Sequence, residues 1–257
     1  MKIEILYSDL CCLYGDKGNT MLLRKCLPDA EFIETALNSK PAFLDGDVDV
    51  VYLCSMSEKS QELVLSRLMP YRETIAAMAK QGKTLFFFVG NAYELVGQYI
   101  QRENGSKVDA LGLFNIYTKR QTPNRFNSLM KIGFGEMKLL GFTSRFSHSY
   151  GLTSDIAMGR VEAGSGENPS SKLEGIYTGS VLATSCTLCY TVDTQGKTVT
   201  YIQSEETYSA AVSKAEAKTS RILATDYAFT EDVTLRTTLA PKNQVEELPQ
   251  ATDSIME

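Results

Sequence analysis

The chain has 257 residues, of which 43% are hydrophobic and 22% charged, and its formal net charge is −5. This size and composition predict a globular protein with a substantial core, built as one large domain or two small ones. An acidic chain without an evident basic face argues against nucleic acid as a partner. The sequence shows no signal peptide and no long apolar span, so we expect a cytoplasmic protein without a membrane span.

Strand-like and helix-like patterns alternate from the N-terminus to about Arg102. We predict strands at Lys2–Tyr7, Ala30–Thr35, Val48–Cys54 and Thr84–Val89. One predicted helix ends near Cys26, a second covers Glu58–Lys80 with a break at Pro70, and a third runs from the last of these strands to Arg102. The third and fourth strands are apolar without alternation, which is typical of strands covered on both faces. This order predicts an α/β fold, a three-layer sandwich with a mostly parallel central sheet.

Short extended segments follow from Gly112 onward, so the later part of the chain is expected to be rich in strands. The predicted strands are Leu113–Thr118, Ser128–Ile132, Met137–Phe142, Ile156–Val161 and Gly175–Thr178, with a hairpin formed by Val181–Val192 and Thr198–Gln203 and a helix at Glu205–Lys218. We place the main domain at 1–203, a C-terminal extension at 204–240, and an acidic, loose tail at 241–257.

The turn after Thr84–Val89 is the most informative stretch of the sequence. In open α/β sheets, ligands bind at the carboxyl ends of such strands, and in many hydrolases this turn carries a Ser or Cys nucleophile. Here the turn consists of Val89, Gly90 and Asn91, none of which is a nucleophile. The sequence therefore predicts the backbone of a catalytic elbow without its chemistry, facing the loop that starts at Ser55.

Cysteine and histidine offer few alternatives. His148 is the only histidine, and we interpret it as a structural or solvated residue rather than a base. Cys54 ends a strand that faces the elbow, and a buried strand cysteine is the favoured interpretation over a displaced nucleophile. Cys186 and Cys189 form one C-x-x-C pair, but a zinc site needs two further ligands, so we predict neither a metal nor another cofactor.

Four segments together resemble a known family. They are Leu13–Arg24, Phe88–Gly97, Leu111–Thr118 with Asn124-Arg125 after it, and Leu140–Tyr150. In order and spacing they resemble the class I glutamine amidotransferase-like proteins of the CobB/CobQ type, and within them the amidotransferase subunits of lipid II isoglutaminyl synthases, which work with a Mur-ligase-like subunit. The resemblance covers about Met1–Leu182 and implies a flavodoxin-like three-layer fold.

The resemblance also implies where the reactive groups of a glutaminase would stand. The attacking cysteine of the family corresponds to Gly90, and the family histidine, which lies in a Tyr-x-His-Gly-Pro-like stretch, corresponds to Gly179. The glycine-rich oxyanion loop corresponds to Cys54–Glu58, which has no glycine. Removing the nucleophile from such a unit costs roughly 10⁶ in rate, so we expect no catalytic residues, with Cys54 and His148 as weak substitutes.

Other family roles carry over to residues that are present. Arg125 matches an arginine that holds the substrate glutamine, and a guanidinium suits a bidentate grip on a carboxylate. Asn91 is expected beside it. The loop with Tyr14, Asp16 and Asn19 lies in a region that is near the ligase subunit in the family, although Asp16 could simply cap the next helix and Arg125 could be a solvated loop residue.

Three hypotheses follow. The first is a degenerate amidotransferase-like subunit without glutaminase activity that binds or regulates a Mur-ligase-like, amide-forming partner in peptidoglycan metabolism. The second is an active glutamine-dependent amidotransferase subunit, of the isoglutaminyl or cobyric acid synthase type, that uses unfamiliar groups such as Cys54 and His148. The third is a sensor of a small molecule or a peptide, such as glutamine or another small amino acid, that uses the old glutamine pocket with Arg125.

Overall fold

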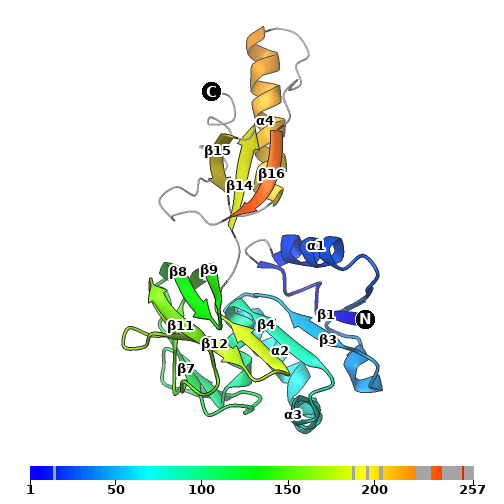
Figure 1. The fold of residues 1–257 in the computed structure, drawn as a ribbon, viewed down its shortest axis with the longest axis vertical. Coiled ribbons are helices and arrows are strands. Elements are labelled where there is room, and N and C mark those ends of the chain that lie inside the picture. Colours follow the sequence, from blue (N-terminus) through cyan, green and yellow to red (C-terminus); the bar gives the residue numbers. More distant parts are fainter. Residues whose placement is uncertain are drawn as a thin grey trace. The chain divides into compact units, whose positions relative to one another are not determined.

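The computed structural model describes residues 1–13, 16–186, 189–194, 197–202, 205–223, 233–238 and 251. The chain forms two compact units, Met1–Thr187 and Leu188–Glu257, drawn in Figure 1. The boundary predicted at 203 falls within the second unit. No helix in the described ranges is long and apolar enough to cross a bilayer.

The first unit begins with the predicted alternation of strands and helices. Its elements are β1 (Lys2–Leu6), α1 (Asp16–Cys26), β2 (Glu31–Thr35), the short 3₁₀ helix η2 (Ala42–Asp45), β3 (Val50–Leu53), α2 (Glu58–Leu68), the 3₁₀ turn η3 (Met69–Tyr71), α3 (Arg72–Gln81) and β4 (Leu85–Val89). The predicted break at Pro70 is confirmed, since this residue lies in the turn that separates α2 from α3. Proline interrupts a helix because it lacks an N–H and its ring clashes with the preceding turn.

The chain after β4 departs from the prediction. The helix predicted to run to about Arg102 is wrong: a 3₁₀ helix, η4 (Gly90–Val96), is followed directly by the strand β5 (Tyr99–Gln101). Gly97 lies so close to another segment that a Cβ atom there would be 2.7 Å from the backbone oxygen of Ile116. The next N–H, from Gln98, donates to that same oxygen at 2.7 Å, so pairing with a distant segment overrides the local helical pattern.

The later elements build the rest of the first unit. They are β6 (Lys107–Asp109), β7 (Tyr117–Arg120), β8 (Phe126–Phe134), β9 (Met137–Arg145), β10 (Ser147–Tyr150), β11 (Ala157–Ala163), β12 (Leu173–Tyr177) and β13 (Val181–Thr184). A nine-stranded sheet has the order β2-β1-β3-β4-β13-β12-β11-β8-β9, and a second sheet has the order β10-β7-β5-β6. In the large sheet β2 to β13 pair in parallel, and β13 to β9 pair antiparallel. The predicted α/β class is confirmed, with a mixed central sheet.

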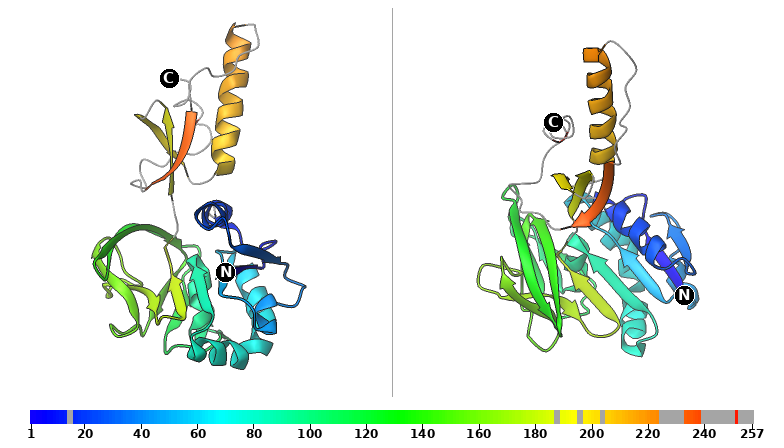
Figure 2. Two further views of the ribbon diagram at one scale, coloured as in Figure 1. Left: turned by 45° about the vertical axis from the view of Figure 1, so that its right-hand side comes forward. Right: turned by 45° about the horizontal axis from the view of Figure 1, so that its top comes forward.

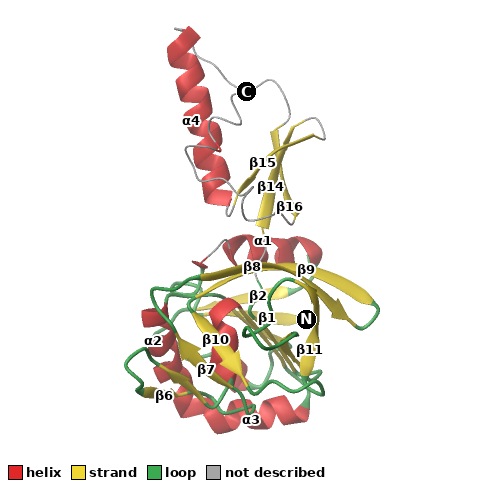
Figure 3. Cartoon of the chain, turned by 90° about the vertical axis from the view of Figure 1, so that its left-hand side faces the viewer, coloured by secondary structure: helices red, strands yellow, loops and turns green. Residues whose placement is uncertain are grey.

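Helices cover both faces of the parallel half of this sheet. The connection from β1 to β2 runs along the sheet in the opposite direction to the connection from β3 to β4. Because such crossovers are right-handed, α1 and the α2–α3 pair lie on opposite faces, as the views in Figure 2 and Figure 3 show. The carboxyl ends of β1 and β3 therefore meet at a topological switch point, where ligand sites form in folds of this kind.

The core of the first unit lies between these layers. Phe43 and Phe86 meet edge to face, with ring centroids 5.8 Å apart. Glu4 in the middle of β1 is fully buried, and its carboxylate accepts from the N–H groups of Ala42 and Phe43 at 2.7 and 2.8 Å. These bonds satisfy the buried charge and fix η2 against the sheet.

The second unit contains a three-stranded sheet and one long helix. Its elements are β14 (Cys189–Thr194), β15 (Lys197–Ile202), α4 (Glu205–Leu223) and β16 (Val233–Thr238), with sheet order β15-β14-β16. The predicted helix and the pairing of β14 with β15 are confirmed. The predicted first arm of the hairpin, Val181–Val192, is wrong as a single strand, because its first part forms β13 in the large sheet of the first unit. Apart from Ala251, the predicted tail at 241–257 lies outside the described residues, as does the side chain of Cys189.

Candidate functional site

A small cavity opens at the carboxyl ends of β3, β4 and β13. It is lined by five serines and eight other residues: Ser55, Ser144, Ser147, Ser149 and Ser185, with Met56, Glu58, Gly90, Asn91, Tyr93, Glu94, Arg145 and Phe146. Its volume is about 20 Å³, which is room for one water molecule or two. Among these described lining residues there is no thiol and no imidazole.

The turn after β4 has the backbone of a catalytic elbow. Gly90 follows the strand directly with φ +61°, in the left-handed region that only glycine adopts without cost. A Cβ atom on Gly90 would lie 2.1 Å from the Oγ and 2.9 Å from the Cβ of Ser55. The hydroxyl of Ser55 therefore fills the space that a side chain at position 90 would need.

The loop after β3 is fastened to this turn through Asn91. The Met56 N–H donates to Asn91 Oδ1 at 2.9 Å, and Asn91 Nδ2 donates to the Met56 carbonyl at 2.6 Å. The predicted facing of these two loops is confirmed. Both ends of the Asn91 amide are used within the protein, and the Met56 N–H is not directed at a ligand. Cys54 is buried beside this loop, 2% exposed, and does not line the cavity.

His148 faces away from the cavity. Its neighbours on β10, Ser147 and Ser149, both line the cavity, and successive side chains of a strand point to opposite faces. The imidazole is 7% exposed and packs on Phe126 with ring centroids 4.0 Å apart. Burial, with a smaller effect from Arg145, lowers the pKa of His148. The structural interpretation fits this residue, and the structure does not bring it together with Cys54 at the cavity.

Gly179 lies at the wrong end of the sheet for the role that the sequence suggested. It occupies the turn before β13 with φ +82° and has open space around it. Strands β13 and β4 are parallel, with Val181 opposite Phe86 and Thr184 opposite Val89. Gly179, the residue matched to the family histidine, therefore lies at the other end of the sheet from Gly90, and the residue that β13 delivers to the cavity is Ser185.

Arg125 stands at the mouth of the cavity. Its guanidinium donates to Ser144 Oγ at 3.0 Å and lies 4.2 Å from the centre of the Phe146 ring. Both of these residues line the cavity. The structure thus places the predicted carboxylate-binding arginine where it could meet an incoming ligand, and its role in binding stays a prediction.

The loop predicted to contact a partner leads into α1. Tyr14 and the side chain of Asp16 lie outside the described residues, while Asn19 lies within α1. No described side chain of α1 is fully buried, and Met21 and Leu22 are 50% and 41% exposed. Leu13, just before the undescribed gap, is also exposed, and its N–H donates to the Ser55 carbonyl at 3.2 Å.

Sequence reasoning missed a cluster of buried charges behind the cavity. The Arg145 guanidinium donates to Ser185 Oγ at 3.0 Å. Glu174, which is fully buried, accepts from the N–H and the Oγ of Ser185 at 2.7 and 3.0 Å. Glu167, also fully buried, accepts from the Tyr93 hydroxyl. Burial, reinforced by the neighbouring Glu174, raises the pKa of Glu167 to about 8. No periodic pattern marked these residues.

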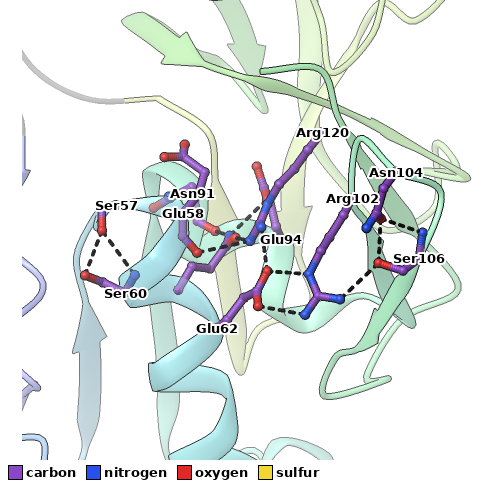
Figure 4. Close-up of polar contacts among 11 residues, drawn as sticks. Ser57, Glu58, Ser60, Glu62, Asn91, Glu94, Arg102, Asn104, Ser106 and Arg120 are labelled. Carbon is purple, nitrogen blue, oxygen red and sulfur yellow. Dashed lines mark hydrogen bonds and ion pairs between the residues drawn. The ribbon is translucent and has the colours of Figure 1, made fainter. Parts of the chain in front are cut away.

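A second polar network, shown in Figure 4, joins α2 to the smaller sheet. Glu62 accepts two hydrogen bonds from Arg102, at 2.9 and 2.8 Å, and one from Arg120 at 2.7 Å. These bonds, that from Arg102 most strongly, lower the pKa of Glu62 to about 2. Arg120 also donates to Gln61 Oε1 at 2.6 Å, and Gln61 donates to the cavity residue Glu94 at 2.9 Å. Burial raises the pKa of Glu94.

The cavity therefore offers hydroxyl, carboxyl, amide and guanidinium groups. These groups can hold a small polar moiety, but the thiolate that glutamine hydrolysis by this route requires is not among them. In the described part of the chain, no three residues of the types that ligate metals converge on one point.

Comparison with known proteins places this geometry among amidotransferases. The family described as the CobB/CobQ-like glutamine amidotransferase domain matches residues 2–188. The lipid II isoglutaminyl synthase (glutamine-hydrolyzing) subunit GatD of Streptococcus pneumoniae is 25% identical over 182 residues, which is 69% of each chain.

One solved structure supports the fold assignment. The crystal structure of a glutamine amidotransferase matches 72% of this chain and 89% of its own, with a TM-score of 0.51 and 14% identity. A glutamine amidotransferase from Thermotoga maritima matches 73% of this chain and 75% of its own, with a TM-score of 0.47 and 10% identity.

Proposed function

Since this chain belongs to the CobB/CobQ-like glutamine amidotransferase domain family, we propose that it is a non-catalytic member of it. In this proposal the chain does not hydrolyse glutamine and acts as a binding or regulatory subunit of a Mur-ligase-like, amide-forming enzyme of peptidoglycan metabolism. The relative from Streptococcus pneumoniae is itself named as a subunit of a synthase, which supports the assignment to an assembly.

One observation carries the proposal: the space for a nucleophile is occupied. Gly90 has no side chain, and the Oγ of Ser55 lies 2.1 Å from where its Cβ would be. Two further contacts agree. The Met56 N–H, from the loop that corresponds to the oxyanion loop, is bound to Asn91, and the cavity has room for little more than water.

The exposed side chains of α1 support a retained docking role. Met21 and Leu22 lie on a helix without a fully buried described side chain, and clustered exposed apolar residues mark interaction sites. The contact from the Leu13 N–H to the Ser55 carbonyl joins this region to the cavity. A partner seated on α1 would therefore act next to the former catalytic turn.

Two measurements test the proposal. Ammonia release from glutamine should stay at background for the wild-type chain, alone and with a Mur-ligase-like partner. Release that is lost on Cys54→Ala would instead establish an active enzyme with an unfamiliar nucleophile.

The chain should also co-purify with the ligase, and Met21→Asp should weaken the complex. Leu63→Asp, which changes a similarly exposed residue on α2, is the matched control and should leave the complex intact.

A sensor of small amino acids is the second candidate, because Arg125 stands at the mouth of the cavity. Calorimetry with glutamine and with cell-wall stem peptides should then detect binding in the wild type that Arg125→Ala removes. Absence of heat with the wild type, or equal binding by the variant, excludes this role.

A further inference from the structure

The loop 164–172, between β11 and β12, carries a buried tripeptide in an exposed setting. Gly166, Glu167 and Asn168 are buried, whereas the residues on either side of them are exposed. An ordinary surface loop keeps its glutamates in water, because a charged carboxyl is among the most costly groups to bury. A glutamate with no exposed surface in such a loop needs a specific reason.

This tripeptide fastens the loop to the back of the cavity. The carbonyl of Gly166 accepts from the Arg145 guanidinium, and the carbonyl of Glu167 accepts from the Ser149 N–H at 3.2 Å. Asn168 Nδ2 donates to the Ser149 carbonyl at 2.6 Å. Arg145 and Ser149 line the cavity, so the position of this loop decides how its rear wall is closed.

The charges around Glu167 do not balance if every group is ionised. Glu174 from β12 and Arg145 from β9 are its charged neighbours, and Tyr93 from η4 donates to its Oε1. His148 from β10 lies at the loop backbone, and burial lowers its pKa. Two carboxylates face one guanidinium, and one proton would make the group neutral.

The unused oxygen atoms suggest where that proton resides. Among the described residues, Glu167 Oε2 and Glu174 Oε2 are buried and accept no hydrogen bond, although the other oxygen of each carboxyl is satisfied. Buried polar atoms are rarely left without a partner. A proton on Glu167 Oε2 turns one of these unsatisfied acceptors into a donor, and the pKa of Glu167, raised to about 8, agrees. Burial also raises the pKa of the adjacent Cys186, so its thiol stays neutral.

We propose that the loop 164–172 is a proton-controlled latch: the closed loop is stabilised while the buried Glu167 carboxyl holds a proton, and it opens more readily as the pH rises, because the released carboxyl gives that proton to solvent. Loss of the proton leaves a net negative charge buried without compensation. The loop then releases Glu167 into water, and Arg145 and Ser149 lose the contacts that close the rear of the cavity. This device is independent of the proposed function, since it requires neither a partner nor catalysis.

Hydrogen exchange of the loop amides tests the latch. Protection in 164–172, corrected for intrinsic exchange, should be constant below about pH 4.5, fall about tenfold for each pH unit between 4.5 and 8, and level off above pH 8. Glu167→Gln, which is neutral at every pH, should keep the protection unchanged across the range. Glu162→Gln, which changes an exposed carboxyl on β11, should behave as the wild type.

Infrared difference spectroscopy of the wild type gives a second readout that needs no variant. A protonated carboxyl group should be visible at neutral pH and disappear as the pH rises through about 8, where the fall in loop protection levels off. Loop protection that falls equally in Glu167→Gln, or a wild type without a protonated carboxyl at neutral pH, overturns the proposal.

Discussion

The parallel half of the nine-stranded sheet and its antiparallel half contribute different chemistry to the same cavity. From the parallel half come Gly90 and Ser55, which meet through steric packing. From the antiparallel half come Arg145 and Glu174, with Glu167 on the loop that joins two of its strands. Substitutions in the parallel half should therefore change the stability of the protein through side-chain volume, and substitutions in the antiparallel half should change it through charge and pH.

The largest expected effect lies in the antiparallel half. Glu174→Ala removes the acceptor for the N–H and hydroxyl of Ser185 and leaves Arg145 with less compensation. Leaving these two donors without an acceptor costs about 1–3 kcal/mol each in the free energy of unfolding. Urea denaturation at neutral pH measures it, and a loss below about 1 kcal/mol would mean that the cluster contributes little to stability.

The second effect is a pH dependence on the alkaline side. The pKa of Glu167 is raised from 4.5 to about 8 in the folded state, so its stabilising contribution is complete below pH 4.5 and is lost as the pH rises through 8. Relative to Glu167→Gln, the wild type should lose a few kcal/mol over this range. Parallel stability curves for the two proteins, measured by urea denaturation, would contradict the assignment.

The third effect lies in the parallel half and should depend on volume alone. Gly90→Cys places a side chain at positive φ and against Ser55, and the strain and overlap together should cost about 2–4 kcal/mol. Adding Ser55→Gly removes the overlap but not the backbone strain, so the double variant should recover part of the loss. Thermal unfolding of both variants measures the difference, and equal stabilities would show that Ser55 does not fill this space.

The smallest effect belongs to the network in Figure 4 and has the opposite pH direction. The pKa of Glu62 is lowered to about 2, so its contribution is present above about pH 4.5 and is lost as the pH falls through 2. Because this side chain is partly exposed, 28%, we expect only about 1 kcal/mol. Glu62→Gln should flatten the acid limb of the stability curve and leave the alkaline limb unchanged, which separates it from Glu167.

Sequence patterns predicted the first half of the fold well because each strand and helix there is set by local periodicity. The run before Val89 is apolar without a break, and Pro70 divides the long helix as expected. The pattern failed after Gly90, where Gln98 pairs with the distant Ile116. Local periodicity contains no information about such a partner.

The sequence alone determined the α/β class, the strand and turn that end at Gly90, and the absence of a nucleophilic side chain in that turn, because these depend on residue type and near neighbours. The tertiary structure decided that Ser55 fills the vacant space, that Gly179 lies at the opposite end of the sheet, and that Glu167 and Glu174 are buried together. Strand order and register bring these residues together or keep them apart, and both are set by the packing of the whole sheet.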